Sequence, residues 1–145
     1  TPDEVKALGM NFKLLLKNEY IAIASYKGKP AAFAVTVPNI NEWFDGLDGK
    51  LLPFGWAKIA MNVFKGRPKT VRMPLMVIRK EFHGSLLGSS LALTVIETLR
   101  RYHTTRGVTH GELSWILEDN LPTRHIIETF GAVPYKTYRI YEKAL

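Results

Sequence analysis

The chain has no cysteine, and this absence removes several classes of function at once. Without thiols there is no disulfide framework, no thiolate metal site and no cysteinyl acyl-enzyme intermediate. No apolar run is long enough to span a bilayer, and no internal repeat or low-complexity tract interrupts the 145 residues. A chain of this length holds one domain with a real core, and a cytoplasmic location is the default expectation.

Basic residues form no long run, although they outnumber acidic residues 20 to 13 and give a formal net charge of +7. That charge suits an anionic partner, such as a phosphorylated cofactor, an acidic carrier protein, a membrane surface or a nucleic acid. The aromatic residues fall mostly at core-like positions, so nucleic acid is the least favoured of these partners. His103, His110 and His125 lack metal-ligand spacing, and no metal is expected.

The order of apolar patterns predicts a mixed α/β sheet flanked by helices, in a single domain of residues 1–145. An amphipathic helix is expected over 1–17, a β-hairpin over 19–38, and an insertion with an apolar helix over 39–69. A strand over 70–78 and a helix over 85–104 follow. A further strand over 108–117, a short helix over 120–131 and one or two strands over 133–145 complete the pattern.

The insertion over 39–69 is too apolar for a solvated linker, so it is expected to pack against something. Leu52, Phe54, Trp56 and Ile59 could shelter a long acyl chain. The alternative is a helix that merely covers the sheet. Functional lids and binding loops often occupy such excursions between strands.

The stretch "RKEFHGSLLGSSLALTVIETLRR", residues 79–101, places glycines and serines between a buried strand and a long helix. Free N–H groups and the positive end of the helix dipole make such a turn an anion site. Gly84 and Gly88 leave room for a phosphate, and Ser85, Ser89 and Ser90 add hydroxyl donors. The turn is neither a P-loop nor a dinucleotide fingerprint, because the lysine and the glycine spacing of those motifs are missing.

The segment "VIRKEFHGSLLGSSLA" resembles the acyl-coenzyme A (acyl-CoA) pyrophosphate loop of the GNAT acyltransferase superfamily. The match rests on six positions, namely Ile78, Glu81, Phe82, His83, Gly84 and Gly88. Downstream, "WILEDNLPTRHIIETFGA" is similar to the family's fifth strand and following helix, with Asn120 and Gly131 at its usual asparagine and glycine. The resemblance covers roughly residues 70–145, and it implies a mostly antiparallel sheet whose fourth and fifth strands splay apart.

The resemblance also implies a mechanism in which acetyl-CoA or another acyl-CoA donates its acyl group directly to an amine. The cofactor's pantetheine would pair with the fourth strand, its pyrophosphate would lie on the loop amides, and no metal would take part. The residues implied or considered for cofactor binding are Val77, Ile78, His83, Gly84, Ser85, Leu86, Leu87, Gly88, Ser89, Asn120 and Arg124. For Arg124 the alternative is an ordinary surface arginine.

Four positions depart from the family pattern. Leu86 stands at the usual middle glycine, His83 replaces an arginine or glutamine, and Ala132 replaces a phenylalanine. Ile127 occupies the position of the tyrosine that often acts as general acid. The family's first strand is also missing ahead of the opening helix, so we expect an upstream segment in a longer chain.

Glu118, at the end of the fifth strand, is the candidate general base, with Ser114 and Glu112 on the same face by alternation. The alternative is that Glu118 complements the N-terminus of the next helix. Tyr138 is the candidate acid.

Three functions remain open. The leading hypothesis is an N-acyltransferase that uses acetyl-CoA and a small-molecule or peptide amine. The second is a long-chain N-acyltransferase whose donor is an acyl carrier protein, and the third is a non-catalytic CoA-binding module. A homodimer is possible in each case.

Overall fold

The computed structural model describes residues 16–45, 47, 52, 54–65 and 68–143. Contacts divide the chain into two compact units, Thr1–Trp115 and Ile116–Leu145, which are described separately below. The helix expected over 1–17 lies outside the described residues except for its last two positions, which are not helical.

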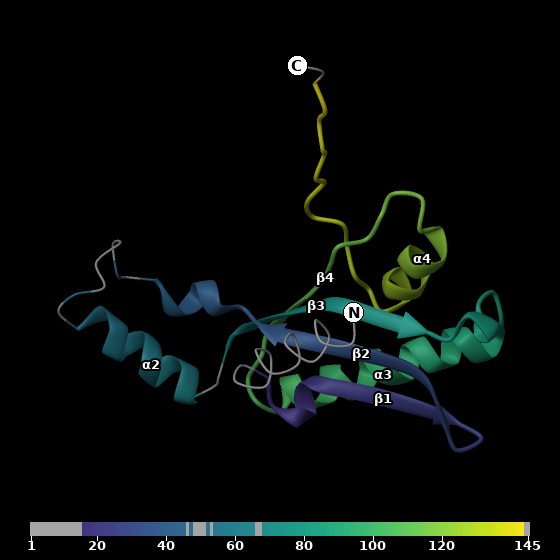
Figure 1. Cartoon of the computed structure of the whole chain (residues 1–145), viewed down its shortest axis with the longest axis horizontal. Coiled ribbons are helices and arrows are strands. Elements are labelled where there is room, and N and C mark those ends of the chain that lie inside the picture. The colour runs from purple at the N-terminus through teal and green to yellow at the C-terminus, as the bar shows by residue number, and fades with distance from the viewer. Residues whose placement is uncertain (1–15, 46, 48–51, 53, 66–67, 144–145) are drawn as a thin grey trace. The chain divides into compact units, whose positions relative to one another are not determined.

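The first unit is built on a four-stranded sheet (Figure 1). Its strands are β1 (Ile21–Tyr26), β2 (Lys29–Pro38), β3 (Thr70–Ile78) and β4 (His110–Leu113), in the spatial order β1-β2-β3-β4. The pairs β1–β2 and β2–β3 are antiparallel, and β3–β4 is parallel. The mixed, mostly antiparallel sheet is therefore confirmed, although β4 is shorter than the expected strand over 108–117.

The hairpin between β1 and β2 is also confirmed, and its turn explains the short connection. Lys27 and Gly28 both have positive φ, at 50° and 75°. Two successive residues of positive φ are typical of the two-residue turns whose twist matches that of antiparallel strands. The glycine adopts this conformation without the steric cost that a side chain brings.

One face of the sheet is covered by the long helix α3 (Leu86–Thr104), which contacts β1, β2 and β3. The apolar stripe predicted for residues 85–104 is the buried side of this helix. The core residues from the sheet include Ala22, Ala34, Val71 and Met73, and those from α3 are Leu91, Ala92, Val95, Ile96 and Leu99. Because side chains alternate along a strand, Val35, Val37 and Arg72 face the opposite side of the sheet.

A buried polar cluster joins the C-terminal end of α3 to β2. The His103 Nε2 atom lies 2.7 Å from Thr36 Oγ1, and the Thr36 hydroxyl donates to the Tyr20 carbonyl at 3.1 Å. A hydroxyl has one proton to donate, so His103 must donate its Nε2 proton to Thr36. Burial, helped by the charge of Arg106, lowers the pKa of His103 to about 4, and the ring is neutral at physiological pH.

The pairing between β3 and β4 is limited to the first residues of β3. Arg72 lies opposite Val37 on β2 and Leu75 lies opposite Val35, so β3 holds one extra residue between these pairs. Such a bulge bends the strand and redirects its backbone groups, and Pro74 within it has no N–H to donate. The last β3–β4 bond runs from Ser114 N to Met73 O at 3.4 Å, and the two strands separate beyond it.

The insertion between β2 and β3 contains the short helix η2 (Ile40–Trp43) and the predicted helix, α2 (Gly55–Lys65). Two hydrogen bonds donated by backbone N–H groups hold η2 beside the start of β3. Asn39 N donates to Thr70 O at 3.0 Å, and Lys69 N donates to the Glu42 carboxylate at 2.7 Å. Trp43 is buried, and α2 contacts η2.

The second unit contains α4 (Leu121–Thr129), close to the short helix expected over 120–131. Asn120 caps it as predicted, with its side-chain oxygen accepting from Thr123 N at 3.3 Å. The strands expected over 133–145 are wrong for the described part of this segment, since residues 132–143 form no strand. The apolar side chains Val133, Ile140 and Tyr141 are exposed there, and a strand without a pairing partner is not stable on propensity alone.

Candidate functional site

The loop from β3 to α3 is held in shape by Ser85, the N-cap of the helix. Its hydroxyl accepts from Gly88 N at 3.0 Å and donates to Phe82 O at 2.7 Å. The loop begins with the short helix η3 (Lys80–Phe82) and turns at Gly84, whose φ is +68°. The Ser85 hydroxyl expected to donate to a phosphate is therefore already engaged within the loop.

The two glycines of the loop have different roles in this structure. A Cβ atom on Gly88 would lie 2.1 Å from the Phe82 carbonyl oxygen, whereas one on Gly84 would meet nothing within 4 Å. Gly88 is thus required by the packing of the loop on the first turn of α3. Gly84 supplies the positive φ of the turn and leaves an open approach to the backbone.

Several amides at this turn remain available to a ligand. Within the part of the chain that the structure describes, the N–H groups of Gly84, Leu86 and Leu87 donate to no carbonyl or side chain. The hydroxyls of Ser89 and Ser90 bond back to Ser85 O and Leu86 O. The amides lie at the positive end of the α3 dipole, an arrangement that can hold an anion such as pyrophosphate.

The edge of β3 that leads into this loop is open for pairing. Arg79 N donates to Ala31 O on β2 at 2.9 Å, so the neighbouring backbone groups of Ile78 point to the other side of the strand. There the His83 Nε2 atom lies 2.9 Å from Ile78 O. A ligand amide that pairs with this carbonyl must share it with His83 or displace the imidazole. Val77 is partly exposed, so its side chain is accessible beside this edge.

Ser114 marks the point where β3 and β4 separate. Its hydroxyl oxygen is buried and has no hydrogen-bond partner among the described residues. Buried polar atoms nearly always have a hydrogen-bond partner, and an atom without one calls for an explanation, such as a ligand that supplies the missing hydrogen bond. The expected face of Glu112 and Ser114 thus contains a buried hydroxyl whose partner is not among the described residues.

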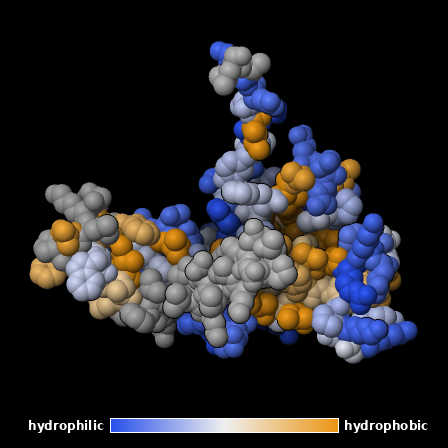
Figure 2. All heavy atoms as spheres, in the orientation of Figure 1, coloured by the Kyte–Doolittle hydropathy of each residue, from blue (hydrophilic) through white to orange (hydrophobic). Residues whose placement is uncertain are grey.

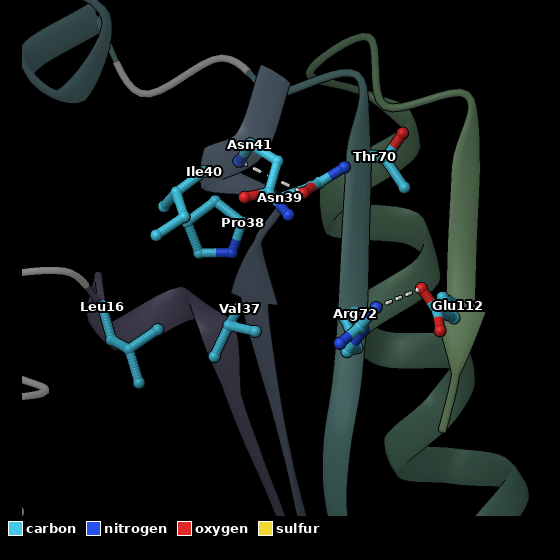
Figure 3. Close-up of a pocket in the computed structure, with 9 residues that line it drawn as sticks. All are labelled: Leu16, Val37, Pro38, Asn39, Ile40, Asn41, Thr70, Arg72 and Glu112. Atoms are coloured by element: carbon cyan, nitrogen blue, oxygen red, sulfur yellow. Dashed lines mark hydrogen bonds and ion pairs between the residues drawn. The ribbon is translucent and has the colours of Figure 1, made fainter. Parts of the chain in front are cut away.

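A cavity of about 260 Å³ lies at the opposite end of β3 from the loop (Figure 3). It opens beside η2, and an ion pair crosses its wall from Arg72 on β3 to Glu112 on β4, with 2.9 Å between Nη2 and Oε2. The Glu112 carboxylate is nearly buried, with 13% of its side chain exposed. The lining residues are Leu16, Val37, Pro38, Asn39, Ile40, Asn41, Thr70, Arg72 and Glu112.

Most of this cavity was not predicted from the sequence. Its residues come from the end of β2, the start of β3 and the start of β4, which are far apart along the chain and meet only through the sheet register. The available signal was the opposite charge of Arg72 and Glu112 at corresponding places in two predicted strands. Opposite charges directly across a strand pair stabilise each other.

The remaining predicted site residues lie in the second unit. Glu118 is exposed in the turn before α4, and the Asn120 side chain is used as the helix cap. Arg124 faces Glu128 one turn along the helix, with 3.7 Å between Nη2 and Oε1. Tyr138 is exposed in the irregular segment after α4. Their roles as base, acid and cofactor ligands stay predictions.

Among the described residues there is neither a candidate metal cluster nor a candidate membrane-spanning helix. No group of three or more His, Asp or Glu side chains that could hold a metal is found among them. No helix within the described ranges is both long and apolar enough to cross a bilayer.

Comparison with solved structures identifies the fold. An aminoglycoside acetyltransferase, AAC(6')-Iy bound to a bisubstrate analogue of CoA, superposes with a TM-score of 0.60 over 97% of this chain and 80% of its own, at 15% identity. A putative acetyltransferase from Agrobacterium tumefaciens gives 0.61 over 99% and 81%, at 16% identity. The chain has the GNAT fold. The resemblance found in the loop sequence is therefore confirmed at the level of fold.

Two curated proteins match the whole chain in sequence, whereas no family model matches it. Protein YghO of Escherichia coli is 41% identical over 145 residues, and a protein named bacterial ceramide synthase from Caulobacter vibrioides is 37% identical over 145 residues. The chain spans only 37% and 38% of the lengths of these two relatives. Among the GNAT-fold structures, a further AAC(6')-Iy structure also contains CoA.

Proposed function

We propose that the chain is an N-acyltransferase that uses an acyl-CoA donor and a long-chain amino alcohol as acceptor. The observation that carries the proposal is the β3–loop–α3 unit. In this unit an open strand edge leads directly to three backbone N–H groups, at a helix N-terminus, that donate no hydrogen bond among the described residues. Solved proteins with the same fold bind CoA or a CoA conjugate. The name of the Caulobacter relative supports the acceptor class, because a ceramide is an amide of a fatty acid and a long-chain amino alcohol.

The donor would lie along β3 and end at the loop. Its pantetheine amide would pair with Ile78 O in place of His83, and its pyrophosphate would accept from the amides of Gly84, Leu86 and Leu87. This arrangement directs the thioester toward the place where β3 and β4 separate, near Ser114. Anion binding by backbone amides needs no side-chain charge, so Leu86 can replace the usual glycine if its side chain points away.

The acceptor would enter from the cavity at the other end of β3. A protonated amine is attracted by the Glu112 carboxylate, whose charge is shared with Arg72 in a poorly solvated wall. The amine must lose a proton before it attacks, and Glu118 is the proposed base. The nitrogen then bonds to the thioester carbon, the C–S bond breaks, and the CoA thiolate leaves and takes up a proton, for which Tyr138 is the proposed donor. The nitrogen gives up its second proton as the amide forms, and this proton restores the tyrosine.

The test is product formation with matched donors and acceptors. The chain is incubated with acyl-CoA of two to sixteen carbons and with an aminoglycoside, a polyamine or a long-chain amino alcohol. Free thiol is followed by colorimetry and the amide by mass spectrometry. The proposal predicts equal amounts of thiol and amide with long-chain donors and the amino alcohol. Thiol release without amide, or amide formation only from an acyl carrier protein thioester, would overturn it.

A further inference from the structure

The insertion carries a set of large apolar side chains on its surface. Each of these residues exposes between 42% and 78% of its surface, and Figure 2 shows hydrophobic residues along this part of the chain. We call this set the η2–α2 surface, and its members are Ile40, Phe44, Leu52, Phe54, Trp56 and Met61. Large apolar side chains that are exposed together in one segment often mark an interaction site.

Helix α2 has the two-sided composition of a helix that lies in a membrane interface. At the helical period, Trp56, Ile59 and Ala60 share a broad apolar face, whereas Lys58 and Asn62 lie on the other side. Trp56 is 59% exposed, although it belongs to the apolar face. Aromatic residues on one face and lysine on the other are typical of interfacial helices. With 11 residues, α2 is too short to span a bilayer.

The charge of the sequence that contains this helix indicates which kind of surface it fits. Between residues 50 and 69 the sequence has five lysines and arginines and no aspartate or glutamate. Each basic residue held near an anionic leaflet contributes roughly 1 kcal/mol of attraction. A protein partner would need a complementary surface that is acidic and apolar and has a fixed shape. An anionic bilayer is acidic and apolar and needs no fixed shape.

The η2–α2 surface is also continuous with the proposed acceptor cavity. Ile40 both lines the cavity and is exposed, and η2 is tied to β3 by the bonds from Asn39 N and Lys69 N. Whatever binds this surface therefore lies next to the entrance used by the acceptor. We propose that the η2–α2 surface docks on an anionic lipid bilayer, from which the acceptor enters the cavity; the inference about the acceptor rests on the proposed function.

Vesicle flotation tests the docking. The chain is mixed with vesicles of phosphatidylcholine alone or with 30% phosphatidylglycerol, a composition chosen at about the level of anionic lipid that makes a surface strongly negative. We expect binding to the anionic vesicles to be at least about tenfold stronger than to the neutral ones and to weaken as salt is raised. The double variant Phe54→Glu/Trp56→Glu should reduce vesicle binding by at least about tenfold, since two glutamates replace exposed apolar groups, one of them on the apolar face of α2.

The pair Val133→Glu/Ile140→Glu is the matched control, because it makes the same two changes to glutamate at exposed apolar residues outside the η2–α2 surface. It should bind vesicles as the unmodified chain does. Circular dichroism and free CoA binding, measured without vesicles, show whether the double variant is folded. Equal vesicle binding by the double variant and the control would overturn the docking. So would a concentration-dependent dimer that only the double variant loses.

The two proposals fail in distinguishable ways. Vesicle binding without CoA binding would leave the docking in place and overturn the proposed function. CoA binding and acyl transfer by a chain that does not bind vesicles would support the proposed function and overturn the docking.

Discussion

Replacing Gly88 by alanine tests the role that the structure gives to the CoA loop. The added methyl carbon would lie 2.1 Å from the Phe82 carbonyl oxygen, so the loop and the first turn of α3 must separate by about 1 Å or more. Crowding of this kind costs about 1–3 kcal/mol of unfolding free energy. Helix propensity acts in the opposite direction, since Gly→Ala in a helix stabilises by up to about 1 kcal/mol. The sign of the change in unfolding free energy therefore shows whether crowding or helix propensity is the larger effect.

Gly88→Ala should lower the unfolding free energy, measured by urea denaturation, and weaken free CoA binding by at least about tenfold, because the loop amides move. Ser90→Ala is the control, since this exposed residue lies in the same helix start and makes only a local bond to Leu86 O. It should leave both quantities nearly unchanged. A Gly88→Ala chain that is as stable as the original, or more stable, would show that the Phe82 carbonyl does not occupy this place.

Three further predictions follow from the buried and charged groups. Because the pKa of His103 is lowered from 6.5 to about 4 on folding, the unfolded chain binds the extra proton. The contribution of neutral His103 to the unfolding free energy should be fully present above pH 6.5 and should fall by about 3 kcal/mol as the pH drops through 4. Urea titrations in which His103→Gln shows the same pH dependence as the original chain would contradict this. Ser114→Ala should not reduce the unfolding free energy, since its hydroxyl has no partner among the described residues, but should lower kcat; a loss of stability with unchanged kcat would refute a substrate role. Glu112→Gln should raise KM for the amine about tenfold and leave KM for acyl-CoA unchanged; equal effects on both would remove Glu112 from the acceptor site.

Local signals in the sequence were sufficient for the elements that carry the cofactor loop. The apolar run over 70–78, the glycine and serine turn, and the 85–104 stripe each correspond to an observed strand, loop or helix. These features depend on near neighbours, such as the Ser85 cap and the positive φ of Gly84. For this reason they can be read from one sequence.

Features that depend on distant partners were predicted less well. The tail with Tyr135, Tyr138 and Tyr141 has strand-like composition, yet it forms no strand within the described residues, because pairing is not a local property. The packing role of Gly88 was not predicted, since the position of the Phe82 carbonyl could not be known from the sequence. The cavity likewise depends on the register that brings Arg72 opposite Glu112.

Titration calorimetry with free CoA tests the central claim most directly. Free CoA carries the pyrophosphate and pantetheine but no acyl chain, so it tests the β3–loop–α3 unit separately from any apolar surface. We predict saturable one-to-one binding in the micromolar range, which is weakened by at least about tenfold in Gly88→Ala and retained in Ser90→Ala. Absence of binding by the original chain, or equal binding by both variants, would contradict the assignment of this loop as the cofactor site.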